Sequence, residues 1–96
     1  MEDRLKVAVI IAAMNASATI ARAIISALAD RNVREVIVVD DASSDDTAAV
    51  ARAADDGSNR LTVLVQPANA GPAAARNRAI DASSSPLIAI LDADDF

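Results

Sequence analysis

The feature that most constrains this chain is a regular alternation of short apolar runs with segments of helical periodicity. Four runs are rich in Val, Ile and Leu without strict polar alternation, and they span 5–13, 34–40, 60–66 and 86–92. A strand that is covered on both faces has this composition, because neither of its faces meets water. The runs therefore predict four strands buried inside a parallel sheet.

Helical signals fill the three intervals between these runs, over 15–30, 43–55 and 69–83. In the first interval, Ile20, Ile24 and Leu28 recur every four residues, as they do on the buried stripe of an amphipathic helix. Asn15 or Ser17 is the expected N-cap of this helix. The intervals therefore predict three helices, one between each pair of strands.

The resulting order β-α-β-α-β-α-β predicts an α/β fold, a Rossmann-like parallel sheet of about four strands with flanking helices. Neither a low-complexity linker nor an internal repeat interrupts residues 1–96. We therefore expect one domain over 1–96. Its core should be thin, since much of the 53% hydrophobic content is alanine and the only aromatic side chain is one Phe.

Carboxylates follow the second predicted strand directly, at Asp40 and Asp41. Ligands of such sheets bind outside the carboxyl ends of the strands. Because side chains alternate along a strand, only one of the two acids points into a given crevice. That acid is a candidate to accept hydrogen bonds from the base or ribose of a nucleotide. The alternative is a solvated turn in which Ser44 or Asp45 caps the next helix.

A second acidic cluster follows the fourth predicted strand. Asp92 and Asp94 are separated by one residue in the sequence "DADD", so they share a side of an extended chain. Like charges so close repel each other unless a cation or water screens them. A hard divalent cation bound to a substrate diphosphate meets this need. A solvated loop is again the alternative interpretation.

The third predicted helix opens with Gly71 and Pro72, and Pro is favoured in the first turn of a helix. A phosphate-binding loop needs more glycines than Gly71 alone, so we do not infer one. Arg76 is placed to reach a phosphate near the start of this helix, or else it is a solvated arginine.

Composition excludes several classes of function. The chain has no Cys and no His, which excludes disulfides, thiolate zinc sites, His-based metal sites and a Ser–His–Asp triad. The net charge of −5 argues against nucleic acid as the partner and suits a divalent cation. The first 15 residues resemble neither a signal peptide nor a membrane span, so we expect a cytoplasmic location, or the inner face of the membrane in a longer protein.

Four segments in this order resemble the N-terminal half of family 2 glycosyltransferases. They are "KVAVIIAAMNASATIARAIISAL", "EVIVVDDASSDDT", "QPANAGPAAARNRAI" and "PLIAILDADD". Members of this family have the GT-A fold and transfer a sugar from a nucleotide-diphosphate donor. The resemblance thus implies that residues 1–96 are the nucleotide-diphospho-sugar-binding part of such an enzyme, truncated at the C-terminal end.

The resemblance also implies roles for individual residues. The segment from Ala13 to Asn15 would border the base and ribose of a UDP- or GDP-type donor. Asp41 would accept a hydrogen bond from the base, and Asp40 would support the turn. On the third helix, the implied donor-pocket residues are Arg76 and Asn77.

For the metal, the resemblance assigns "DAD" to the D-x-D motif of the family. Asp94 would bind Mn²⁺ or Mg²⁺ on the diphosphate, and Asp92 would contact the ribose or the metal and its water shell. Asp95 would support these groups from behind. The function implied is a metal-dependent sugar transfer to an acceptor hydroxyl, with inversion at the sugar, in glycan or polysaccharide synthesis.

This chain departs from the family pattern at three positions. Ala12 and Met14 replace a Pro and an aromatic residue that borders the base, and Met is soft enough to pack there. Ala42 stands where the family often has Gly, which matters only if the turn requires a positive φ. The catalytic base of the family lies beyond D-x-D, so the isolated chain should be inactive, and a glycan or lipid-linked acceptor would bind elsewhere.

Three other functions remain as alternatives. One is a non-catalytic nucleotide-binding fragment or pseudoenzyme module. A sugar-phosphate nucleotidyltransferase would need a Gly-rich basic loop after the first strand, which "AAMNAS" lacks. A phosphoacceptor receiver domain would need an Asp after the third strand, where Gln66 and Pro67 stand. An open sheet edge with apolar faces also predicts self-association of the chain.

Overall fold

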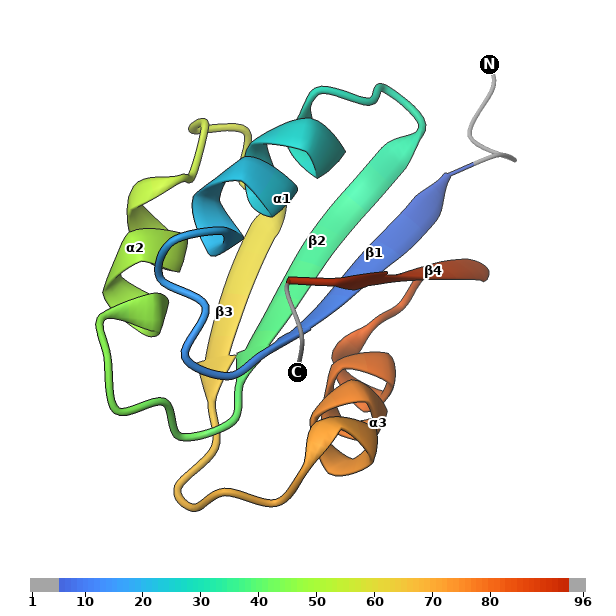
Figure 1. Cartoon of the computed structure of the whole chain (residues 1–96). Coiled ribbons are helices and arrows are strands. Elements are labelled where there is room, and N and C mark those ends of the chain that lie inside the picture. Colours follow the sequence, from blue (N-terminus) through green and yellow to red (C-terminus); the bar gives the residue numbers. More distant parts are fainter. Residues whose placement is uncertain (1–5, 94–96) are drawn as a thin grey trace.

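The structure is a computed structural model that describes residues 6–93, and in this range strands and helices alternate along the chain (Figure 1). The strands are β1 (Val7–Ala13), β2 (Val33–Asp40), β3 (Leu61–Val65) and β4 (Leu87–Asp92). The helices are α1 (Ile20–Leu28), α2 (Thr47–Ala53) and α3 (Pro72–Ala82). The α/β class, the element order and the parallel sheet of four strands are all as predicted.

All the strand pairs of the sheet are parallel, and the strand order is β3-β2-β1-β4. The chain therefore moves outward from β1 through β2 to β3 and then crosses back to the other side of β1. Val9 of β1 pairs with Val36 of β2 and with Ala89 of β4, which makes β1 an inner strand. Because the strand order reverses beside β1, the crevice at its carboxyl end is the place where this class of sheet binds ligands.

Helices cover the two faces of the sheet unequally. Ile20 and Ile24 of α1 are fully buried against one face, which α2 also covers. On the opposite face α3 packs through the small side chains of Ala75 and Ala79 (Figure 1). The α3 core is the smaller of the two, as expected for a chain whose apolar residues are largely alanine.

The two edge strands depart from the sequence-based expectation: β3 is only partly buried, with Val65 41% exposed, and β4 departs further. Its run was predicted to be buried on both faces, yet the exposed fractions are 47% for Leu87, 39% for Ile88, 55% for Ile90 and 39% for Leu91. The reason is position: β4 is an edge strand beside β1, whereas the described helices pack over β1, β2 and β3 (Figure 1). The side chains of β4 therefore present apolar surface on both faces of the sheet.

The amino end of β4 is held by a polar contact with β2. Glu35 accepts hydrogen bonds from the hydroxyls of Ser83 (2.8 Å) and Ser85 (2.7 Å), which lie in the segment before β4. Burial alone would raise the pKa of Glu35, but these hydroxyl bonds outweigh it and hold the pKa below its ordinary value. A charged Glu35 therefore anchors the start of the edge strand.

Helix α1 begins later than predicted. Its N-cap is Thr19, and neither Asn15 nor Ser17 caps it. Both residues instead bond to the loop after β2, as described below. Pro72 opens α3 as expected. Within residues 6–93, none of the helices has the length and apolar character needed to cross a bilayer.

Candidate functional site

The predicted acids that the structure describes, Asp40, Asp41 and Asp92, lie on one edge of the sheet, on either side of the end of β1. In the register of the sheet, Ala13 pairs with Asp40 of β2 and Ala12 pairs with Asp92 of β4. Two strand spacings separate the backbones of Asp40 and Asp92, which is about 10 Å. The two clusters thus flank the carboxyl end of β1 at close range.

Side-chain alternation divides these acids between the two faces. Asp40 is in register with Ala13, which belongs to the core under α1 and α2. Asp92 is in register with Ala12, which belongs to the core under α3. Asp41 follows Asp40 and also bonds to the start of α3. Asp41 and Asp92 therefore share the α3 side, and Asp40 lies on the other.

Asp41 is completely buried and holds the loop that precedes α3. Its Oδ1 accepts a hydrogen bond from the backbone N–H of Ala70 and its Oδ2 accepts one from Gly71, both at 2.8 Å. Its own N–H donates to the carbonyl of Ala13 at 2.9 Å. The expected contact of Asp41 with a base remains a prediction. In this structure a base can reach the carboxylate only after displacing the atoms that cover it.

Asp40 and Asn15 belong to a network that joins the loop after β1 to the loop after β2. Asp40 is 3% exposed and accepts hydrogen bonds from the N–H (3.2 Å) and the hydroxyl of Ser43. The same hydroxyl accepts the N–H of Asn15 at 2.8 Å. The side-chain carbonyl of Asn15 accepts the N–H of Ser44 at 2.9 Å. Asp40 thus bonds to Ser43 within the turn after β2, and its role in a donor site stays a prediction.

Asn15 and Ala42 adopt positive φ angles, 51° and 60°. Asn tolerates the left-handed region, because its side chain bonds locally, whereas Ala is strained there. The turn after β2 therefore does require a positive φ at the position where the family often has Gly.

A further link between the same two loops runs through Thr47 and Asp45. The hydroxyl oxygen of Thr47 accepts the N–H of Ala16 at 2.8 Å and donates its own proton to Asp45. The other carboxylate oxygen of Asp45 accepts the N–H of Ser17 at 3.2 Å. Chiefly because of the Thr47 hydroxyl bond, the pKa of Asp45 is lowered from 3.8 to about 2. Asp45 therefore stays charged at neutral pH. The N-cap of α2 is Asp46, and not Asp45 as the sequence suggested.

Met14 and Asn69 meet at the carboxyl edge of the sheet. The side-chain amide of Asn69 contacts Met14 Sδ and the carbonyl of Asp41, both at 3.2 Å. Met14 is partly exposed here, at the position where the family has an aromatic residue. Sequence reasoning missed Asn69, because a polar residue in a turn carries no signal of a contact 55 residues away.

Asp92 is exposed at the carboxyl end of β4 and is the described part of the D-x-D motif. Asp94 and Asp95, the predicted metal ligand and its support, lie outside the described residues. Within residues 6–93 no group of three acids is positioned to hold a metal ion. An exposed carboxylate oxygen is nevertheless the donor type that Mn²⁺ and Mg²⁺ prefer. The carboxylate of Asp92 is therefore a suitable ligand for such an ion.

The residue after Asp92 is tethered to the start of α1. Ala93 is 6% exposed, and its carbonyl accepts a hydrogen bond from the hydroxyl of Thr19 at 2.7 Å. Sequence reasoning did not single out Thr19, since a Thr before an apolar helix predicts only a cap.

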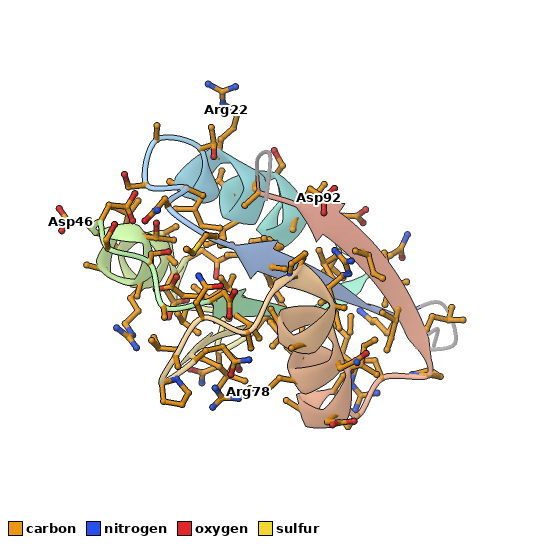
Figure 2. All side chains as sticks on the ribbon, turned by 60° about the horizontal axis from the view of Figure 1, so that its bottom comes forward. Arg22, Asp46, Arg78 and Asp92 are labelled. Atoms are coloured by element: carbon orange, nitrogen blue, oxygen red, sulfur yellow. The ribbon has the colours of Figure 1, made fainter. Side chains whose placement is uncertain are left out.

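The arginines of α3 differ in what they contact. Arg76 is half-buried and Asn77 is exposed, about one turn from the helix start. Arg78 donates to the carbonyl of Val65 (3.0 Å) and to Gln66 (2.7 Å). Figure 2 shows Arg78 well separated from Asp92. Arg78 therefore stabilises the end of β3, which leaves Arg76 as the candidate for a phosphate.

A surface pocket of about 580 Å³ lies at the opposite edge of the sheet. Its lining consists of Lys6, Leu28, Ala29, Arg31, Val33, Arg34 and Arg60. Arg60 is committed to structure there, because its guanidinium donates to the carbonyls of Leu28 and Val33. The pocket is at the amino ends of the strands, so it does not belong to the acidic site.

Comparison with known proteins connects this geometry to a family. The sequence model of Glycosyl transferase family 2 matches residues 8–96. The succinoglycan biosynthesis protein ExoU of Rhizobium meliloti (strain 1021) is 62% identical over 90 residues, which are 94% of this chain and 26% of that protein.

Solved structures give the same relationship. The mannosyltransferase PcManGT of Pyrobaculum calidifontis, in complex with GDP-Man and Mn²⁺, superposes with a TM-score of 0.80 at 28% identity over 95% of this chain and 28% of that one. TarS 1-349 of S. aureus, in complex with UDP-GlcNAc, superposes with a TM-score of 0.79 at 28% identity over 95% of this chain and 27% of that one.

The chain therefore spans about a quarter of the length of these relatives. Within that quarter it has the same parallel sheet and helices, the N-terminal portion of a GT-A fold. The match over nearly all its residues, together with this fold, shows that the chain belongs to glycosyl transferase family 2.

Proposed function

We propose that residues 1–96 are the donor-binding part of a metal-dependent glycosyltransferase that transfers a sugar from a nucleotide diphosphate to an acceptor hydroxyl. The observation that carries this proposal is the register of the sheet. It sets the loop after Asp40 and the carboxylate of Asp92 on either side of the end of β1, where the strand order reverses.

The nucleotide base and ribose of a UDP- or GDP-type donor bind between three loops. These are the segment from Ala13 to Asn15, the turn that starts at Asp40, and the loop before α3. The side chains of Ser43, Thr47 and Asp41 already join these loops by accepting backbone hydrogen bonds, so little ordering is needed when a donor binds. Relatives of known structure are complexes with GDP-Man and with UDP-GlcNAc, which supports this donor class.

The diphosphate lies toward α3 and β4. Arg76 and Asn77 are positioned near the start of α3, where the helix dipole also favours anions. Asp92 and Asp94 would hold Mn²⁺ or Mg²⁺ there, and Mn²⁺ is present in the PcManGT complex. When bound, the ion stabilises the negative charge that develops on the leaving diphosphate.

The remaining steps belong to the proposal as well. Transfer with inversion requires a base that removes the proton of the acceptor hydroxyl. Among the described acids at this edge, Asp40, Asp41 and Asp45 are engaged in hydrogen bonds within the chain, and Asp92 is assigned to the metal. We therefore expect the isolated chain to bind a donor without transferring the sugar. A role in polysaccharide synthesis agrees with the name of the succinoglycan relative. To this the proposal adds a glycan or lipid-linked acceptor and a place at the cytoplasmic face of a membrane.

Calorimetric titration of the chain with UDP and with GDP, each with and without Mn²⁺, tests the donor site. We expect one of the nucleotides to bind, more tightly with Mn²⁺. Asp92→Asn should abolish most of the Mn²⁺-dependent part, because it removes a charged ligand.

Asp46→Asn is the matched control. Asp46 is an exposed acid at the start of α2 whose side chain makes no capping bond, and Figure 2 shows it far from Asp92. This variant should bind as the original chain does. Absence of nucleotide binding, or binding that Mn²⁺ leaves unchanged, contradicts the proposal.

A further inference from the structure

We propose that Thr19 is a positioning residue for the D-x-D segment: its hydroxyl holds the Ala93 carbonyl and thereby the end of β4 that carries Asp92. Thr19 is the N-cap of α1, with φ −123°, yet its side chain makes no capping hydrogen bond. A Thr at this position ordinarily accepts an N–H from the first turn of its helix. Its hydroxyl is therefore available for another partner.

The partner is 74 residues away in the sequence. Thr19 Oγ1 lies 2.7 Å from the carbonyl oxygen of Ala93 and 3.4 Å from that of Ala16. A hydroxyl has one proton to donate, and the shorter distance is typical of a good O–H···O bond. The proton therefore belongs to the bond with Ala93.

The carbonyl that Thr19 holds is the one between the two acids of the motif. The peptide group that contains the Ala93 carbonyl is planar and ends at the nitrogen of Asp94. Fixing this carbonyl restrains the backbone that directly follows Asp92, so the exposed carboxylate of Asp92 is presented from a held strand end.

At this end β4 is otherwise held by its backbone pairing, in which Asp92 lies opposite Ala12, and by the packing of Ala93 in the core. Its apolar side chains are exposed on both faces, from 39% at Ile88 to 55% at Ile90. At its amino end β4 is anchored by Glu35 through the hydroxyls of Ser83 and Ser85. At its carboxyl end the side-chain bond among the described residues is the one from Thr19.

Thr19 is itself anchored to the nucleotide side of the site. Its N–H donates to the carbonyl of Ala16 at 3.0 Å, and the N–H of Ala16 donates to Thr47 at 2.8 Å. A continuous path of hydrogen bonds therefore runs from the loop after β2, through the loop after β1, to the D-x-D segment. Thr19 is the last residue of this path. It therefore sets the distance between the loops that would bind the nucleotide base and the D-x-D segment that would bind the metal ion.

This inference rests on the proposed function, because it assumes that the D-x-D carboxylates bind a cation. Thr19→Val keeps the shape of the side chain and removes the hydroxyl, whereas Thr19→Ser keeps the hydroxyl. We expect Thr19→Val to weaken Mn²⁺ binding about three- to tenfold, the usual value of one hydrogen bond. Thr19→Ser should bind Mn²⁺ within about twofold of the original chain.

The measurement is calorimetric titration with Mn²⁺ alone, and then with UDP or GDP in the presence and absence of Mn²⁺. Thr62→Val, at an exposed position of β3, is the matched control and should leave both affinities unchanged. Nucleotide binding without Mn²⁺ should be the same in Thr19→Val as in the original chain. If Thr19 had a purely structural role, Thr19→Val would also weaken nucleotide binding in the absence of Mn²⁺. Thr19→Ser would then not restore the Mn²⁺ affinity alone.

Hydrogen exchange of the backbone amides of residues 91–93 tests the hydrogen bond from Thr19 to the Ala93 carbonyl in the absence of any ligand. Thr19→Val should accelerate exchange there, and Thr19→Ser should not. Equal Mn²⁺ affinity in Thr19→Val and the original chain overturns the positioning role and leaves the proposed function standing. If the original chain binds neither Mn²⁺ nor nucleotide, the proposed function fails together with the positioning role, and faster exchange then marks a contact with a structural role alone.

Discussion

Two acidic clusters end two strands of the same sheet, and they differ in how the protein uses its carboxylates. After β2, Asp40 and Asp41 are buried, and backbone N–H groups or hydroxyls bond to them. After β4, Asp92 is exposed, and the segment is tied to the domain through the Ala93 carbonyl. A buried carboxylate whose oxygens are satisfied builds the scaffold, whereas an exposed one is available to a ligand.

The largest effect is expected from removing the buried acid of the first cluster. Asp41→Ala leaves the N–H groups of Ala70 and Gly71 without their acceptor and opens a cavity, so the free energy of unfolding should fall by about 3 kcal/mol. Urea unfolding monitored by circular dichroism measures it. Asp46→Ala, which removes an exposed acid, should change stability by less than about 0.5 kcal/mol. Equal effects at Asp41 and Asp46 would remove the distinction between scaffold and ligand acids.

The next effect concerns the exposed faces of β4. Two copies of the chain can cover these faces by pairing along the open edge, so we expect self-association at micromolar concentration. Ile90→Lys should weaken it more than tenfold, because it puts a charge on each copy at the interface. Ile25→Lys, at a residue of α1 that is 58% exposed compared with 55% for Ile90, should weaken it little. Sedimentation equilibrium measures both, and a clean monomer of the original chain contradicts the prediction.

A smaller effect is expected at the turn after Asp41. Ala42 has a φ of 60°, where Gly is free of strain, so Ala42→Gly should raise the free energy of unfolding by about 0.5–1 kcal/mol. Ala49→Gly, at an exposed position inside α2, should lower it by about the same amount. Thermal unfolding distinguishes the two by sign. The same sign for both variants would show that Ala42 is unstrained.

The smallest effect is the dependence of stability on pH through Asp45. Its pKa is about 2 in the folded chain and 3.8 in a model peptide, so its contribution is fully present above pH 3.8 and is lost as the pH falls through about 2. Asp45→Asn should therefore lower stability at neutral pH and have progressively less effect toward pH 2. Denaturant unfolding at several pH values measures this. A stability difference that stays constant from pH 6 to pH 2 would argue against the Thr47 bond.

Much of the fold could be predicted from local patterns. The Val, Ile and Leu runs end within one or two residues of the strands, since burial in a parallel sheet selects those side chains on both faces. The same reasoning was wrong about the burial of the edge strands β3 and β4. The composition of a segment shows that it suits a buried position, but it does not show which elements cover it. Similarly, Asn15 and Ser17 have capping chemistry, yet their bonds go to Ser43, Ser44 and Asp45.

The family match removes the nucleotidyltransferase and receiver-domain alternatives that the sequence left open. The non-catalytic alternative stays a prediction, which the nucleotide titration addresses. The site residues stay predictions as well, although the geometry now separates Asp41, which is covered, from Asp92, which is exposed.

The sequence by itself determined the alternation of strands and helices, the positions of the acids at strand ends and the family of the chain, because these depend on composition and order along the chain. Only the tertiary structure decided that Asp41 closes on the loop before α3 and that Thr19 holds the D-x-D segment. Those contacts join residues 29 to 74 positions apart. Hydrogen bonds between residues so far apart in the sequence depend on how the loops meet at the edge of the sheet. The local periodicity of the sequence does not predict how they meet.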